Sequence, residues 1–314
     1  MRVHRALAPA KVNLGLFVGP KRASDARHEL VSVMQSISLA DELTLQEGQA
    51  GLAQDEVVCP GVPGPPSANL AAAALAAFRA STGWQAPPLR LSILKRIPVA
   101  AGLGGGSADA AATLRLARHA SGLGDEALLR QLACELGADV PAQISPGRWL
   151  ATGAGERLEE LPSPGAELAL LVLPLPTQLS TAAVYAEADR LGLARTLEEL
   201  EGRRLELSAA LIRGEREVVG SELVYNDLQP AAVSLCPQIA DALEQARDAG
   251  ADLALVSGSG PTVVGLFSQQ AIGASSDSLE RAGDAAAGLK GRVPAPICAT
   301  PVDALSSACV TIPD

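Results

Sequence analysis

The sequence predicts a protein that contains both strands and helices, with enough chain for about two domains. Its 314 residues allow two domains or one large one, at roughly 100–200 residues per domain. Stretches of alternating apolar residues indicate strands, and apolar residues at helical spacing indicate helices. Hydrophobic residues make up 48% of the chain and aromatic residues only 2%. Sizeable cores are therefore expected, and they must be built from Ala, Leu and Val.

The composition argues against several classes of partner. The formal net charge is −10, whereas a protein that binds the phosphate backbone of a nucleic acid needs basic stripes. The five cysteines are widely spaced and form no C-x-x-C pair, so neither a disulfide framework nor a zinc site is indicated. No apolar run approaches the length of a membrane span, and no leader peptide is apparent. We expect a cytoplasmic protein with reduced thiols.

The first half of the chain begins with strand-like segments. Lys11 and Asn13 lie on one face of a predicted strand over residues 11–18. Two interpretations of these polar residues remain: they are functional groups, or that face of the strand is exposed to solvent. Residues 48–66 are rich in Gly and Pro and are expected to form a long loop or irregular hairpin. The other elements expected here are paired strands within residues 31–45 with a turn at residues 40–42, a helix over residues 69–80 with Ser67 as its N-cap, and a strand over residues 89–94.

A glycine-rich stretch, PVAAGLGGGSADAAATL at residues 98–114, is the strongest local signal. Four glycines lie between residues 102 and 106, Ser107 and Asp109 follow, and a helix is expected over residues 108–119. Glycines let backbone N–H groups approach oxygen atoms closely, and a helix N-terminus favours an anion. The stretch therefore predicts a phosphate site, in which Ser107 is a candidate N-cap or ligand of the phosphate or its metal ion.

Other phosphate-binding motifs fit this stretch poorly. A Walker A loop needs a Lys after the glycines, and the dinucleotide fingerprint needs a glycine where Ser107 stands. No segment reads H-R-D or D-F-G, so a protein kinase is not supported. His28 begins H-E-L-V-S rather than H-E-x-x-H, which excludes a zinc-protease motif. The remaining alternative for the glycines is a flexible turn before a core helix.

The second half of the chain alternates helices and strands. Asp125 is expected to cap a helix that ends at Gly137, and Asp139 follows in a turn or as another N-cap. The other expected elements are a polar turn within residues 149–158, a strand over residues 168–173, a helix after residues 180–181 that carries Tyr185, charged helices within residues 191–219, a helix over residues 239–248, two strand-like runs flanking a Gly-rich turn within residues 253–267, and a helix within residues 268–291.

The glycine-rich stretch resembles the ATP-phosphate motif of the GHMP kinases. Residues 9–14, PAKVNL, residues 137–141, GADVP, and the second Gly-rich turn also resemble segments of this family, so the resemblance covers about residues 8–267. It implies an α+β fold of two domains. Residues 1–150 would form an ATP-binding domain like domain 2 of ribosomal protein S5, and residues 151–314 a ferredoxin-like α/β domain, with the active site between them.

One member of the family has segments similar to GLGGGSADAAA and GADVP of this chain. That member belongs to the non-mevalonate isoprenoid pathway. The alcohol that it phosphorylates carries a cytidine diphosphate. The resemblance implies ATP and Mg²⁺ as cofactors, a small-molecule partner, and Lys11 and Asp139 as catalytic residues. It implies Asn13, His28 and Tyr185 as substrate-binding residues. The ATP-binding residues that it implies are Asn69, Lys95, Pro98, Val99, Ala100, Ala101, Gly102, Leu103, Gly104, Gly105, Gly106, Ser107 and Ala108.

Two features leave alternatives open. The family reads D-G-Y-H-x-L where this chain has Ala26 and Arg27 before His28, so the stacking residue of the family is missing; a guanidinium can lie flat against a base instead. Without the resemblance, His28, Lys95 and Tyr185 would read as a surface histidine, a strand-end charge and a core residue. The rival functions are another GHMP kinase, of mevalonate or homoserine type, and a non-catalytic nucleotide-binding protein. A monomer or a homodimer is expected.

Overall fold

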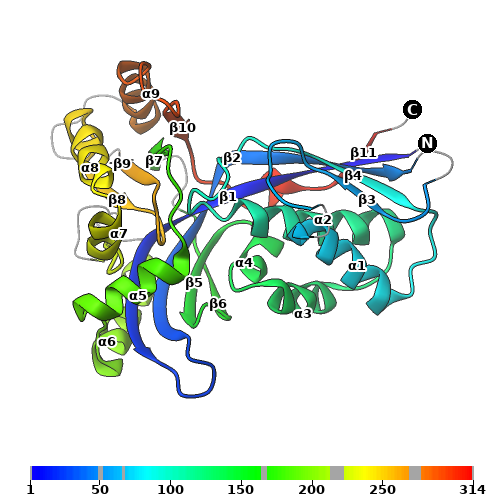
Figure 1. Cartoon of the computed structure of the whole chain (residues 1–314), viewed down its shortest axis with the longest axis horizontal. Coiled ribbons are helices and arrows are strands. Elements are labelled where there is room, and N and C mark those ends of the chain that lie inside the picture. The colour runs from blue at the N-terminus through cyan, green and yellow to red at the C-terminus, as the bar shows by residue number, and fades with distance from the viewer. Residues whose placement is uncertain are drawn as a thin grey trace.

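The structure is a computed structural model that describes residues 2–48, 52–65, 68–163, 168–212, 223–268 and 277–312. It confirms the predicted α+β fold, because helices pack against two separate, largely antiparallel sheets (Figure 1). None of the helices in these ranges is long and apolar enough to cross a membrane. All five cysteines are free, as predicted.

The first sheet has seven strands in the described part of the chain, with β11, β1, β2, β4 and β3 in that order and β5 and β6 branching from β2. Four helices pack on one face, where Ala and Leu side chains fill the core as the composition predicts. The elements of this half are β1 (Val3–Lys21), β2 (His28–Glu47), β3 (Glu56–Val58), β4 (Leu89–Leu94), β5 (Arg148–Gly153), β6 (Arg157–Leu161), β11 (Val310–Ile312), α1 (Leu70–Thr82), α2 (Gly105–Ser121), α3 (Glu126–Leu136) and α4 (Val140–Ile144).

The second sheet has the order β10-β7-β9-β8. The inward side chains of β7 and β9 pack against α5, α7, α8 and α9 and form a separate core. The elements are β7 (Leu168–Leu173), β8 (Leu253–Val256), β9 (Val263–Ser268), β10 (Ile297–Ala299), α5 (Thr181–Leu191), α6 (Leu197–Ile212), α7 (Gln229–Leu235), α8 (Gln238–Asp248) and α9 (Ser278–Gly288).

The long hairpin of β1 and β2 connects the two halves (Figure 1). Leu16 and Val18, near the far end of β1, pack into the core of the second half, and the Leu16 N–H donates to the Tyr225 carbonyl at 2.8 Å. The C-terminal segment runs from the second half back to the first, because β10 pairs with β7 in the second sheet and β11 pairs with β1 in the first. The predicted domain boundary after residue 150 falls within β5 and stays a prediction.

The two Gly-rich segments pack directly against each other. A Cβ added to Gly102, whose φ is +77°, would lie 2.6 Å from the Gly260 carbonyl oxygen and 3.0 Å from that of Ser257. The Lys11 N–H donates to the Leu103 carbonyl at 2.9 Å, so β1 holds the first segment from the other side. Asn226 fixes the second segment by donating from Nδ2 to the Val256 and Gly258 carbonyls.

The predicted turn at residues 40–42 is wrong, because β2 runs continuously through it. Asp41 is fully buried within the strand, and its carboxylate accepts hydrogen bonds from Lys95 Nζ and from the Arg96 and Ile97 N–H groups. The charged residues at this position favour a turn on the surface, whereas in the structure the charge of Asp41 is buried and compensated by Lys95. The irregularity lies just before, where the pairing with β1 shifts register between Pro9 and Lys11.

The predicted helices that lie within the described residues are present, with earlier or later ends. Of the charged helices predicted within residues 191–219, α6 is present, and residues 213–219 lie outside the described residues. Asp125 caps α3 by accepting from the Leu128 N–H at 2.9 Å, as predicted. Ser67 lies outside the described residues, and Asn69 caps α1 through its side chain. Helix α2 begins at Gly105, three residues before the predicted start, so Gly105 and Gly106 belong to its first turn.

We predict that Gly102→Ala destabilises the fold by about 1–3 kcal/mol or more, because the new methyl group would meet backbone oxygens at a left-handed position. Gly106→Ala is the matched control, since its Cβ would have only Leu70 Cδ1 nearby, at 3.9 Å, and Ala favours a helix over Gly. Urea unfolding measures both. Equal stability of the two variants would contradict the proposed packing of the Gly-rich segments.

Candidate active site

Lys11 and Asp139 lie together, although they come from β1 and from the start of α4. Lys11 Nζ is 3.3 Å from Asp139 Oδ2 and donates to Asn13 Oδ1 at 2.7 Å. The Lys11 side chain is 9% exposed and that of Asp139 34%. A buried ammonium group is costly unless paired, and these two oxygens supply the pairing. The structure therefore brings together three residues that were selected from the sequence.

Asn13 is held in one orientation. Its Nδ2 donates to Ser32 Oγ at 2.7 Å, and the Ser32 hydroxyl donates in turn to the Gly15 carbonyl at 2.8 Å. Asn13 Oδ1 must then face Lys11. Gly258 packs closely against Asn13, because a Cβ at Gly258 would lie 3.1 Å from Asn13 Oδ1. The alternative interpretation of Lys11 and Asn13 as a solvated strand face is wrong, since both residues are buried.

The first glycine-rich segment lines a pocket of about 360 Å³. The pocket contains every residue predicted to bind ATP except Ala108, which is buried within α2. Gly104 is the N-cap of α2 in a left-handed conformation, and an added Cβ would lie 2.9 Å from Lys11 Cγ. The N-terminus of a 17-residue helix thus opens beside Lys11, an arrangement suited to a phosphate group.

A buried charge cluster closes this pocket. Lys95 Nζ donates to the carboxylates of Asp41 and Asp109, and no described residue donates a hydrogen bond to Asp109 Oδ1. Burial raises the pKa of Asp109 to about 7; Asp41 adds to this rise and Lys95 opposes it. Burial acts against the charged form of Lys95, but the two carboxylates outweigh it and raise its pKa. The Lys95 ammonium is therefore not a free strand-end charge.

A larger pocket of about 700 Å³ lies on the other side of Asp139. His28 and Tyr185 meet in it with ring centroids 5.1 Å apart and ring planes at 34°. Burial, and then the negative charge of Asp139, raises the pKa of Tyr185 to about 12. His28 Nδ1 donates to the Gly19 carbonyl at 2.8 Å. The two residues predicted to bind a base thus share one pocket.

Arg27 lines the same pocket, but its guanidinium is engaged elsewhere. Arg27 Nε lies 2.9 Å from Asp25 Oδ2, and Nη2 lies 3.8 Å from Glu156 Oε2. Asp25 also binds Arg22 at 2.6 Å, and these contacts lower the pKa of Asp25 strongly. Arg27 therefore belongs to a charge network at the rim, and its predicted stacking on a base stays untested.

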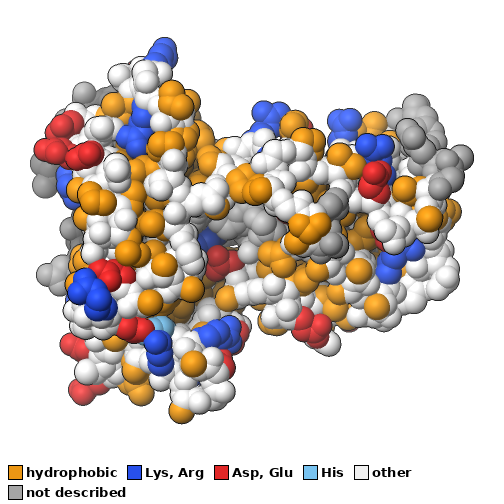
Figure 2. All heavy atoms as spheres, in the orientation of Figure 1, with side chains coloured by type: hydrophobic (Ala, Val, Ile, Leu, Met, Phe, Trp, Pro, Cys, Tyr) orange, Lys and Arg blue, Asp and Glu red, His pale blue; other side chains and the backbone are white. Residues whose placement is uncertain are grey.

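A middle pocket of about 260 Å³ joins the other two. It shares Gly102 and Gly104 with the pocket of the first glycine-rich segment, and Asp139 and Tyr185 with the larger pocket. Lys11 and Asn13 line it. Figure 2 shows the molecule hollowed between its two parts. The Lys11–Asp139 pair thus lies between the two outer pockets.

Several residues of the site were not selected from the sequence as binding groups. Asp41 lies in the predicted turn at residues 40–42, and the sequence marks Asp109 only as a polar residue after the glycines. Asp189, which faces His28 from α5, gave no signal because a lone Asp in a charged helix is ordinary. Their partners come from distant elements, so only the three-dimensional contacts identify them.

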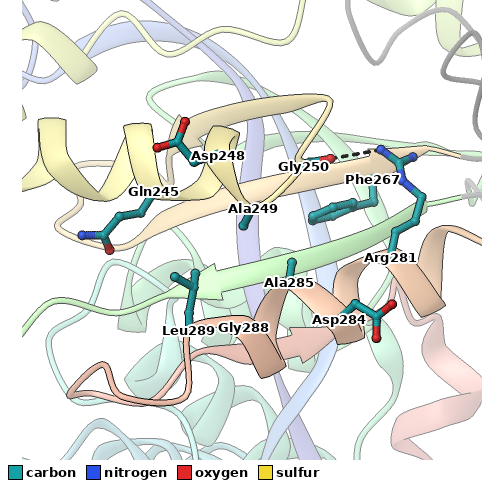
Figure 3. A pocket seen from close by; sticks show the side chains of 10 residues that line it. All are labelled: Gln245, Asp248, Ala249, Gly250, Phe267, Arg281, Asp284, Ala285, Gly288 and Leu289. Carbon is teal, nitrogen blue, oxygen red and sulfur yellow. Dashed lines mark hydrogen bonds between the residues drawn. The ribbon is translucent and has the colours of Figure 1, made fainter.

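A separate groove of about 570 Å³ lies between α8 and α9 (Figure 3). Its single cationic lining residue, Arg281, donates to the Gly250 and Ser268 carbonyls and to Asp252. No residue that lines this groove belongs to the site described above.

The described part of the chain contains no cluster of three or more His, Cys, Asp or Glu residues that would hold a metal ion.

Known proteins resemble this chain in sequence and in structure. The profiles for the GHMP kinases N terminal domain and the GHMP kinases C terminal domain match residues 69–147 and 197–289. The chain is 42% identical over 268 residues to the 4-diphosphocytidyl-2-C-methyl-D-erythritol kinase of Streptomyces coelicolor, covering 82% of this chain and 85% of that protein. It is 44% identical over 264 residues to the enzyme of that name from Thermobifida fusca, covering 81% and 83%.

Solved structures of related proteins superpose on this chain over nearly its whole length. A crystal structure of 4-(cytidine 5'-diphospho)-2C-methyl-D-erythritol kinase superposes with a TM-score of 0.69 at 30% identity, covering 98% of this chain and 97% of that one. A homoserine kinase from Cytophaga hutchinsonii superposes with a TM-score of 0.73 at 18% identity, covering 99% and 97%. At that identity the second match shows the fold alone.

We predict that Asp109→Asn stabilises the protein more at pH 8 than at pH 5. Because the folded-state pKa is raised to about 7 from an ordinary 3.8, the wild type loses stability as pH rises between these values. The neutral amide removes this loss, giving a relative gain of about 1–3 kcal/mol at pH 8. Urea unfolding at both pH values measures it.

Asp248→Asn, at an exposed position of α8, is the control and should change little with pH. A gain for Asp109→Asn that is the same at pH 5 and pH 8 would contradict the raised pKa of Asp109.

Proposed function

The chain belongs to the GHMP kinases, and we propose that it transfers the γ-phosphoryl group of ATP to the 2-hydroxyl of 4-diphosphocytidyl-2-C-methyl-D-erythritol. Two relatives named 4-diphosphocytidyl-2-C-methyl-D-erythritol kinase are 42% and 44% identical over more than four fifths of the chain. The observation that carries the proposal is the Lys11–Asp139 pair between a phosphate pocket and a larger pocket that holds His28 and Tyr185.

The phosphate pocket is suited to ATP. Backbone N–H groups at the start of α2 would bind the phosphates, and Asn69 and Lys95 line the pocket beyond them. Because phosphoryl transfer needs mainly placement and charge stabilisation, a rigid glycine loop next to the Lys11 ammonium supplies much of what the reaction requires. Mg²⁺, when bound, would neutralise phosphate charge. Ser107 fits a ligand of that ion because it lines both outer pockets, and Mg²⁺ needs only one or two protein ligands beside phosphates and water.

Asp139 is the proposed general base. Its carboxylate is the more exposed partner of the pair and lines the larger pocket, so it can accept the proton of a hydroxyl placed there. Lys11 would stabilise the negative charge that develops on the transferred group. Asn13 fixes the Lys11 ammonium and lines the middle pocket, next to the acceptor.

The larger pocket favours the cytidine-bearing acceptor over a small one. Its volume of about 700 Å³ and its two neighbouring rings suit a flat base, whereas homoserine and mevalonate offer no aromatic group. His28 and Tyr185 are the proposed base-binding residues. A non-catalytic nucleotide-binding role is disfavoured because the Lys11–Asp139 pair is intact.

We predict that Asp139→Asn lowers kcat by about 10²–10⁴-fold, the usual contribution of a general base, while acceptor affinity changes only a few-fold. Coupled-assay measurement of ADP release gives kcat, and calorimetry gives the affinity. Lys11→Ala should cause a comparable loss of kcat. Asp125→Asn is the matched control, since Asn caps a helix about as well as Asp; near-normal turnover of Asp139→Asn would remove Asp139 as the base.

A further inference from the structure

Three polar side chains converge at one end of the larger pocket. Lys21, His28 and Asp189 all line it. Asp189 Oδ2 is 2.6 Å from Lys21 Nζ, and Asp189 Oδ1 is 3.2 Å from His28 Nε2. None of the catalytic steps proposed above uses Asp189 or Lys21.

Asp189 comes from α5, one helical turn after Tyr185, so the two side chains lie on the same face of the helix. Ala182 and Ala186 line the pocket beside them. These small side chains leave room for a flat ring against Tyr185, with its edge toward Asp189. The helix thus presents a stacking surface and a carboxylate at fixed spacing.

The carboxylate has spare acceptor capacity. An ionised carboxylate offers about four acceptor positions; Lys21 occupies one on Oδ2, and His28 Nε2 lies 3.2 Å from Oδ1 without a hydrogen bond. The hydrogen bond from Lys21 lowers the pKa of Asp189 and outweighs the opposing effect of burial. Asp189 is therefore ionised at neutral pH and can only accept. Its side chain is 33% exposed, which leaves it accessible to a ligand in the pocket.

We propose that Asp189 determines the base specificity of this kinase by accepting a hydrogen bond from the exocyclic amine of cytosine. This inference rests on the proposed function. Cytosine carries an N–H₂ donor where uracil carries a carbonyl oxygen, and a carboxylate that accepts from cytosine N4 is an established pairing in base recognition. A uracil base would place its oxygen against the Asp189 carboxylate, and two acceptors in a partly buried site repel each other.

Lys21 and His28 have supporting roles. The Lys21 ammonium compensates the charge of Asp189 close to where a diphosphate must bind. His28 is fixed by its Nδ1 hydrogen bond to the Gly19 carbonyl, so its ring keeps Asp189 in place from the other side. Arg27, which lines the same pocket, is bound to Asp25 and Glu156 and does not compete for Asp189.

The test compares two acceptors, the cytidine compound and its uridine analogue, with wild type, Asp189→Asn and Glu187→Gln. Glu187 lies on α5, pairs with Arg190 and Ser234 and does not line the pocket, so its isosteric change is the control. ADP release gives kcat/KM for each acceptor. Binding of CDP and UDP, measured by calorimetry, reports the same preference without turnover.

We expect wild type and Glu187→Gln to prefer the cytidine acceptor by about 100-fold or more. In Asp189→Asn the preference should fall at least about 10-fold, mainly through KM, because the amide can also donate to a carbonyl oxygen. An unchanged preference would overturn the proposal. So would an equal loss of kcat/KM for both acceptors, which would mean that Asp189 only positions His28.

Asp189→Ala is the second variant, should Asp189→Asn fold poorly, and it should also lose the preference. If wild type turns over neither acceptor, the proposed function fails. The CDP and UDP affinities still decide whether Asp189 distinguishes the bases.

Discussion

The structure of the site depends on the burial of one cation, Lys11, where the two halves of the molecule meet. A buried ammonium group must be paired, and Asn13 and Asp139 provide the two oxygens. Asn13 is held by Ser32, and Asp139 is held at the start of α4. The positions of three elements, β1, β2 and α4, are therefore coupled through a single charge.

The same cation explains why glycines are needed around it. A Cβ at Gly104 would lie 2.9 Å from Lys11 Cγ, one at Gly258 would press against Asn13 Oδ1 at 3.1 Å, and one at Gly102 would collide with the second Gly-rich segment. The two segments approach Lys11 closely because their glycines have no side chain. Backbone N–H groups without side chains in the way are also what allows a phosphate to be bound closely. Packing of the fold and binding of the phosphate thus demand the same residues.

Much of this could be predicted from the sequence, because the glycine-rich segment, the strand before it and residues 137–141 are local patterns. The resemblance of these patterns to the GHMP kinases singles out Lys11, Asn13, His28 and Tyr185, and the structure gathers them around Asp139. Asp41 could not be placed, since its charge suggests a turn until Lys95 and the backbone N–H groups of Arg96 and Ile97, just after β4, are known. Asp189 and the path of the C-terminal segment likewise depend on contacts between residues far apart in the chain.

The proposed reaction transfers a phosphoryl group from ATP to a cytidine-bearing alcohol with the help of the Lys11–Asp139 pair. The most direct measurement is ADP release with Mg-ATP against 4-diphosphocytidyl-2-C-methyl-D-erythritol, 2-C-methyl-D-erythritol 4-phosphate, mevalonate, homoserine and galactose. Turnover with the cytidine compound alone is the predicted result. Turnover only with an acceptor that lacks the nucleotide, or ATP binding without ADP release for any of the five, would contradict it.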